Sequence, residues 1–117
     1  MITCYLRYVI DPAKIEEFEH YAHLWTALIE KFGGTHLGYF LPEKTPDSAA
    51  FSFPGFGKEG PDNVAIALFS FPDQAAYDAY RQKAATDPEC QAATEYFRET
   101  NCFLRYERSF MRQLSRD

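Results

Sequence analysis

Two similar segments constrain the fold of this chain more than any other feature of the sequence. The segments YVIDPAKIEEFEHY and FSFPDQAAYDAYRQ each contain an apolar run, a proline and then a helical pattern. Their prolines, Pro12 and Pro72, lie 60 residues apart in a chain of 117. Proline suits the first turn of a helix, where its missing N–H would have no partner. The repeat predicts two similar β-α-β halves, and the length predicts a single domain over residues 1–117.

Residue patterns place the strands and helices. Apolar residues at spacings of three and four, from Ile15 to Phe32, predict a helix that Gly33 and Gly34 end. A second helix begins at Pro72-Asp73, and Asp87-Pro88 restarts or kinks it. Runs rich in β-branched and aromatic residues predict four strands, at residues 2–10, 35–42, 64–71 and 101–111.

The resulting order, β-α-β-β-α-β, favours an α+β, ferredoxin-like fold. In that fold the sheet is antiparallel, its strands take the order 4-1-3-2, and both helices cover the same face. The strand VAIALFSF is nevertheless apolar on both sides, and two helices can cover only one of them. Because monomers seldom expose so large an apolar patch, we predict a homodimer with two sheets packed face to face. The sequence leaves open whether Phe69 and Phe71, or Ile66 and Leu68, face the partner.

The segment between the second and third predicted strands contains GFGKEG, which has the spacing of a dinucleotide-binding motif. That motif requires a helix N-terminus directly after it to bind the phosphates. Here the strand at 64–71 follows instead. We therefore interpret residues 43–63 as a long connection that does not bind nucleotides.

The charge and hydropathy patterns exclude several partners. Net charge is −5 and no basic run is present, which argues against nucleic acid and anionic membrane surfaces. No apolar run is long enough to span a membrane, and no signal peptide precedes the strand that begins at Ile2. We therefore expect a cytoplasmic protein.

Neither a metal nor a cofactor is predicted. The three cysteines, Cys4, Cys90 and Cys102, show no metal-ligand spacing. His20 and His23 have a spacing that can chelate a metal, but the helical wheel places both on the polar surface, which favours a solvated face.

Charged residues inside the predicted strands are candidates for an anion anchor. Arg7, Arg105 and Glu107 are expected to be largely buried and close together, since the first and last strands are neighbours. An ion-paired structural contact is the favoured interpretation, with Glu107 as the partner of Arg7. The alternative is that Arg7 anchors a ligand anion.

Aromatic residues form a second candidate site. Trp25, Tyr39, Tyr77 and Tyr80 would line a cavity between the sheet and the helices, although such residues more often belong to a core. His36 is also placed to reach the interior, although a histidine in a strand is more often a hydrogen-bonded structural residue. The candidate ligand-binding residues are therefore Arg7, Trp25, His36, Tyr39 and Tyr77.

Several segments resemble NIPSNAP domains, which belong to the dimeric α+β barrel superfamily. They are YLRYVIDPAKIEEFEHY, GYFLPE, DPEC and RYERSFMRQL. The resemblance spans almost the whole chain and implies a homodimeric barrel; Cys90 stands where the family pattern has Trp. The superfamily includes cofactor-free quinol oxygenases and haem-degrading enzymes. This chain lacks the Asn in 2–10 and the His in 72–100 that haem degradation would need.

Three functions remain open at this point. The first is a NIPSNAP-like homodimer that binds a small apolar or aromatic ligand between sheet and helices, with no reaction assigned. The second is a cofactor-free monooxygenase acting on an aromatic or quinol substrate in the same cavity. The third is a purely structural dimerisation module.

Overall fold

The computed structural model describes residues 1–47 and 49–117. The elements follow the predicted order, with the second helix divided in two. They are β1 (Ile2–Ile10), the short 3-10 turn η1 (Pro12–Lys14), α1 (Ile15–Lys31), β2 (Thr35–Phe40), β3 (Val64–Phe71), α2 (Gln74–Thr86), α3 (Pro88–Thr100) and β4 (Phe103–Met111). No helix in the described residues is long and apolar enough to cross a membrane.

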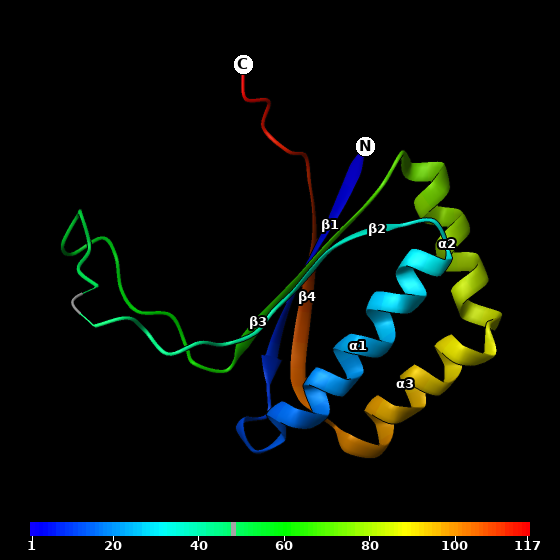
Figure 1. Ribbon diagram of the computed structural model, residues 1–117, viewed down its shortest axis with the longest axis horizontal. Coiled ribbons are helices and arrows are strands. Elements are labelled where there is room, and N and C mark those ends of the chain that lie inside the picture. The colour runs from blue at the N-terminus through cyan, green and yellow to red at the C-terminus, as the bar shows by residue number, and fades with distance from the viewer. Residues whose placement is uncertain (48) are drawn as a thin grey trace.

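The four strands form one sheet in the order β2-β3-β1-β4, and every neighbouring pair is antiparallel. This order confirms the predicted ferredoxin-like arrangement. All three helices lie on the same side of the strands (Figure 1). β1 and β3 are therefore central strands, while β2 and β4 form the two edges.

Aspartate and proline residues explain where the helices begin. The Asp11 side chain accepts a hydrogen bond from the Ala13 N–H and caps η1, which leads directly into α1. The Asp73 side chain accepts a hydrogen bond from the Ala76 N–H and caps α2. Asp87 adopts an extended conformation, and its side chain accepts a hydrogen bond from the Cys90 N–H. Because Pro88 has no N–H to donate, the chain starts a new helix there instead of continuing α2.

Two strand boundaries differ from the predicted ones. β2 ends at Phe40, two residues before the predicted end at residue 42. The cause is Pro42, which has no N–H to donate to a neighbouring strand. β4 begins at Phe103 because Asn101 takes the left-handed conformation, φ 50°, that terminates α3. Within β2, Gly38 has φ 128° where the register shifts after His36.

The structure shows which residues of β3 face the helices and which face away from them. Ala65, Ala67, Phe69 and Phe71 are buried on the side of the helices. Ile66 and Leu68 point to the opposite side, together with their cross-strand partners. No helix covers this second side, which we call the open sheet face. Its apolar residues include Tyr5, Phe40, Ile66, Leu68 and Met111.

The expectation that Arg7, Arg105 and Glu107 are largely buried is wrong for the single chain. Arg7 and Glu107 do pair, at 3.6 Å, but their side chains are 33% and 66% exposed, and Arg105 is also exposed. The cause is their position: β4 is an edge strand, and no helix covers the open sheet face.

The segment containing GFGKEG is confirmed as a connection. Residues 51–60 are exposed, and they extend away from the sheet (Figure 1). The next element is β3, so no helix N-terminus follows the glycines. A short turn closes at Phe53, whose carbonyl accepts a hydrogen bond from the Phe56 N–H.

Candidate ligand cavity

A cavity of about 610 Å³ lies between the sheet and the helices. Its floor is the helix-facing side of the two central strands, with Cys4, Leu6 and Tyr8 from β1 and Phe69 from β3. These side chains share one face because alternate residues of a strand point the same way. The remaining walls come from all three helices and from both edge strands; the residues are Tyr21, Trp25, Ile29, Tyr39, Tyr77, Tyr80, Arg81, Ala84, Ala85, Thr94, Phe97, Arg98, Phe103, Leu104, Arg105, Tyr106 and Arg108.

Three tyrosines meet in the cavity beneath α1. The ring centroids of Tyr8 and Tyr39 are 6.1 Å apart, and those of Tyr8 and Tyr21 are 6.4 Å apart. Burial raises the pKa of each of the three hydroxyls above its ordinary value. All three therefore stay neutral at physiological pH, where a phenol can both donate and accept a hydrogen bond.

Trp25 offers a further hydrogen-bond donor. Its indole nitrogen Nε1 is buried and has no hydrogen-bond partner in the described part of the chain. The Tyr21 hydroxyl is close enough for the indole to act on its pKa, but the two do not meet in hydrogen-bonding geometry. Buried indole N–H groups usually find a partner, so this donor is available to an acceptor that enters the cavity.

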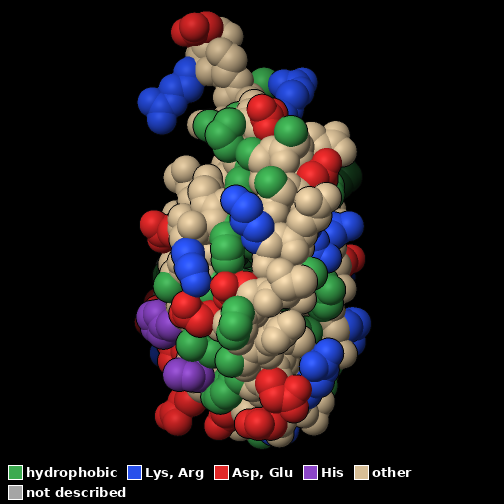
Figure 2. Space-filling view, turned by 90° about the vertical axis from the view of Figure 1, so that its right-hand side faces the viewer, with side chains coloured by type: hydrophobic (Ala, Val, Ile, Leu, Met, Phe, Trp, Pro, Cys, Tyr) green, Lys and Arg blue, Asp and Glu red, His purple; other side chains and the backbone are tan. Residues whose placement is uncertain are grey.

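Arginines lie around the side of the cavity where β4 faces α2 and α3. Arg81 comes from α2, Arg98 from α3 and Arg108 from β4, and all three are exposed. Arg108 Nη1 lies 3.5 Å from the Tyr77 hydroxyl. The view from the side of α2 and α3 shows hydrophobic side chains among both basic and acidic ones (Figure 2). The cavity thus has an apolar interior and a cationic mouth.

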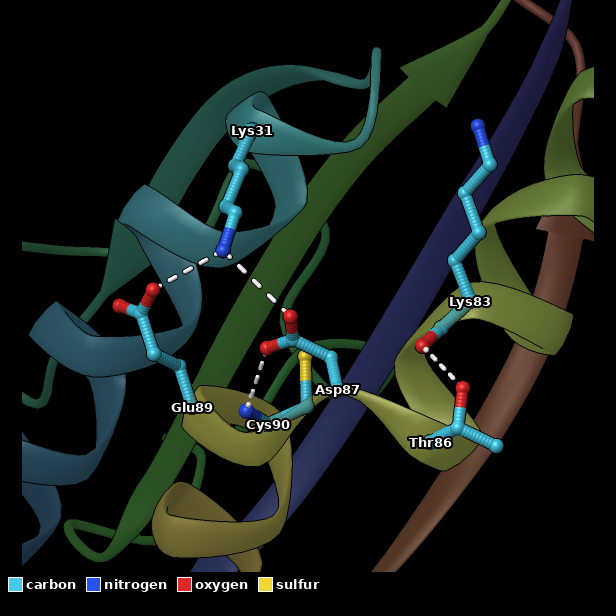
Figure 3. A network of polar contacts seen from close by, with 6 residues as sticks. All are labelled: Lys31, Lys83, Thr86, Asp87, Glu89 and Cys90. Carbon is cyan, nitrogen blue, oxygen red and sulfur yellow. Dashed lines mark hydrogen bonds and ion pairs between the residues drawn. The ribbon is translucent and has the colours of Figure 1, made fainter.

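A polar network fixes the junction between α2 and α3 against α1. The Lys31 ammonium lies 3.4 Å from an oxygen of Asp87 and 2.9 Å from one of Glu89 (Figure 3). Asp87 also accepts a hydrogen bond from the Cys90 N–H, and this bond is the largest cause that lowers the pKa of its carboxyl group. The network therefore positions the two helices that form one wall of the cavity.

The structure separates the predicted site residues into two groups. Trp25, Tyr39 and Tyr77 line the cavity, as does Tyr80. Arg7 lies in register with Ile66, a residue of the open sheet face, and so points away from the cavity.

His36 is on the side of the helices but does not line the cavity. Its ring stacks on Tyr39, with centroids 5.1 Å apart, and its Nδ1 accepts a hydrogen bond from the Gly38 N–H. Its Nε2 is buried without a partner in the described residues. Burial lowers the pKa of His36, so the ring is neutral at physiological pH.

The remaining candidate ligands of a metal stay apart. His20 and His23 are exposed on α1. Cys4, Cys90 and Cys102 are buried free thiols, and burial raises the pKa of Cys4 to about 11. Within residues 1–47 and 49–117, no three His, Cys, Asp or Glu side chains are arranged to hold a metal ion.

Sequence reasoning missed Tyr8, Tyr21 and the three arginines Arg81, Arg98 and Arg108. The alternation of β1 could have found Tyr8, which shares a face with Cys4 and Leu6. Arg81 follows Tyr77 by four residues on α2 and so lies on the same side of that helix. Nothing in the sequence showed that β4 would bring Arg108 to the same place.

A four-stranded antiparallel sheet with helices on one face and a cavity between the layers defines a ferredoxin-like α+β domain. The NIPSNAP family model matches residues 5–116, so the chain belongs to the NIPSNAP family. A sequence comparison with curated proteins finds no match.

Solved structures share this fold. A NIPSNAP domain protein from Burkholderia xenovorans is 20% identical, with a TM-score of 0.71, and the match covers 100% of this chain and 98% of that one. A NIPSNAP family protein from Agrobacterium tumefaciens is 19% identical, with a TM-score of 0.72, over 98% of this chain and 94% of that one. A putative antibiotic biosynthesis monooxygenase from Nitrosomonas europaea is 8% identical, with a TM-score of 0.64, over 98% of this chain and 100% of that one.

Proposed function

We propose that this NIPSNAP protein is a homodimer that binds a small apolar or aromatic molecule in the cavity between its sheet and helices. The observation that carries this proposal is the cavity of about 610 Å³. Its volume lies within the range of about 300–1,000 Å³ that small-molecule sites occupy. A few polar groups in an apolar wall are typical of such sites, and the Trp25 N–H and the Tyr8, Tyr21 and Tyr39 hydroxyls supply them.

The test uses the neutral fluorescent probe phenylnaphthylamine and the intrinsic emission of Trp25. Trp25 is the only tryptophan of the chain and lines the cavity, so energy transfer from the indole reports a probe bound there. We expect saturable binding at one site per chain. Ala84→Phe should weaken it, because Ala84 lines the cavity.

The matched control is Ala75→Phe, which adds the same ring at an exposed position on α2 away from the cavity. Thermal melts of both variants should match the native protein to within a few degrees. Binding that is absent in the native protein, or equal in the two variants, would contradict the proposal.

The open sheet face supports the homodimer. At its centre Tyr5 pairs with Leu68, and Ile66 pairs with Phe40 of the edge strand β2. Phe40 and Met111, near the edges of the face, are 56% and 49% exposed. A second copy of the same face would bury this apolar area by the hydrophobic effect.

A cofactor-free monooxygenase acting on an aromatic or quinol substrate is a second candidate. It is supported by the shared fold with the putative antibiotic biosynthesis monooxygenase and by the aromatic walls of the cavity. Oxygen uptake on addition of a hydroquinone, reduced in Ala84→Phe but not in Ala75→Phe, would favour it. An open cavity favours either function over a purely structural dimerisation module.

A further inference from the structure

The charges that line the cavity differ from those of the whole chain. The protein has 17 acidic and 12 basic residues, a net charge of −5. The cavity is nevertheless lined by the side chains of Arg81, Arg98 and Arg108 and by no Asp or Glu. Such a concentration of one sign of charge around an apolar hollow raises the local concentration of small anions.

The arginines lie at the mouth and not on the floor. The floor residues Cys4 and Phe69 are buried, whereas all the lining arginines are exposed. A molecule with one charged end can therefore place its apolar part inside and its charge at the mouth. A guanidinium group suits this role because it presents several N–H donors in a planar fork to an oxyanion.

Two of the arginines converge beside Tyr77. Arg81 lies one helical turn after Tyr77 on α2, and Arg108 Nη1 lies 3.5 Å from the Tyr77 hydroxyl. Both guanidinium groups also act on the Cys4 thiol below them, since each lowers its pKa against the larger opposing effect of burial.

Neither of these two arginines is neutralised by a carboxylate. In the part of the chain that the structure describes, no Asp or Glu lies within 4.0 Å of Arg81 or Arg108. Arg98 differs, because it pairs with Glu95 at 3.3 Å. The two groups that converge beside Tyr77 therefore have their charge available for a ligand.

From this geometry we infer that the ligand is a small amphipathic anion. Its apolar ring system lies in the cavity, and its carboxylate, sulfonate or phosphate group binds Arg81 and Arg108 at the mouth. This inference rests on the proposed ligand-binding function and adds the charge of the ligand to it.

Two matched fluorescent probes test the inference. Anilinonaphthalene sulfonate is an aromatic anion, and phenylnaphthylamine is the same ring system without the sulfonate. We expect the native protein to bind the anionic probe about tenfold more tightly, as one charge-assisted contact would allow. Added salt should weaken the binding of the anion and leave the neutral probe unaffected.

The variants identify the arginines responsible. In the double variant Arg81→Gln with Arg108→Gln, the affinity for the anion should fall to that for the neutral probe, whose own affinity stays unchanged. Arg81→Gln alone should give part of this loss, which keeps the test valid if the double variant does not fold. Arg116→Gln, in the C-terminal segment outside the cavity, should change neither affinity.

Each outcome has a distinct meaning. Equal binding of the two probes by the native protein, or a preference for the anion that survives the double variant, would overturn the inference while leaving the proposed function intact. Absence of binding by both probes would overturn the proposed function and the inference with it.

Discussion

Arg7 on β1 and Glu107 on β4 form an ion pair across the sheet, with Arg7 Nη1 3.6 Å from Glu107 Oε1. The two residues are direct register partners in the antiparallel ladder. Both side chains remain in contact with water in the single chain, because the open sheet face has no cover there.

A double-mutant cycle on this pair should therefore give a small coupling energy. For Arg7→Met, Glu107→Leu and the double variant, urea unfolding at low protein concentration should yield a coupling below about 1 kcal/mol, as for other exposed ion pairs. A coupling of several kcal/mol would mean instead that the pair is desolvated, which only a second molecule on this face could cause.

Leu68 and Phe69 are neighbours on β3 that point to opposite sides of the sheet. The same substitution should therefore affect assembly at Leu68 and folding at Phe69. Leu68→Asp places a charge on the open sheet face and should convert the proposed homodimer to a folded monomer. Phe69→Asp buries an unpaired charge among Cys4, Phe71 and Tyr80 and should unfold the chain. Light scattering gives the mass and circular dichroism gives the fold; a Leu68→Asp protein that remains dimeric would contradict the assignment of the interface.

The stability of the protein should fall as the pH falls from 7.5 to 5.5. Burial lowers the pKa of His36 in the folded protein, so below the ordinary histidine pKa of 6.5 the unfolded chain binds more protons than the folded one, which favours unfolding. His36→Phe should reduce this pH dependence. His23→Phe, at an exposed position of α1, is the control and should leave it unchanged in urea unfolding at several pH values.

Asp87 should stabilise the protein at neutral pH through its cap on α3 and its contact with Lys31. Asp87→Ala removes both and should lower the Tm by several degrees, whereas Asp87→Asn keeps an oxygen for the Cys90 N–H and should lower it less. Asp62→Ala, at an exposed position, serves as the control.

The pH dependence of this contribution follows from the lowered pKa of Asp87. The stabilisation is fully present above 3.8, the ordinary value, and is lost as the pH falls from there through the lowered pKa. Native protein and Asp87→Ala should therefore differ in Tm at pH 7 and converge at the acidic end of the titration. A constant difference down to pH 2 would show that the charge of Asp87 plays no part.

The fold was largely predictable from the sequence because its signals are local. The apolar spacing from Ile15 to Phe32 and the Asp-Pro pairs determine the helices without reference to distant residues. The alternation of β3 was not predictable, since Ile66 and Phe69 are equally apolar and only the packed helices distinguish the two sides. Glu107 was identified as the partner of Arg7, but the exposure of the pair depends on what covers an edge strand.

The cavity was predictable only at its aromatic residues, Tyr39 on a strand and others at helical spacing. Trp25 and Tyr77 were found in this way. Arg81 and Arg108 are exposed charges, and in a sequence such residues cannot be told from any solvated surface. Their convergence depends on the placement of β4 opposite α2, which is a property of the whole fold.

The position of β4 has a consequence for how the empty and occupied protein exchange amide protons. β4 pairs only with β1, and eight of its nine residues are exposed, so its outer N–H groups have no ladder partner and its end can fray. Arg108 and Tyr106 lie on this strand and line the cavity. A ligand that contacts them would hold the strand in place, and deuterium uptake along residues 103–111 would then slow in proportion to the occupancy of the cavity.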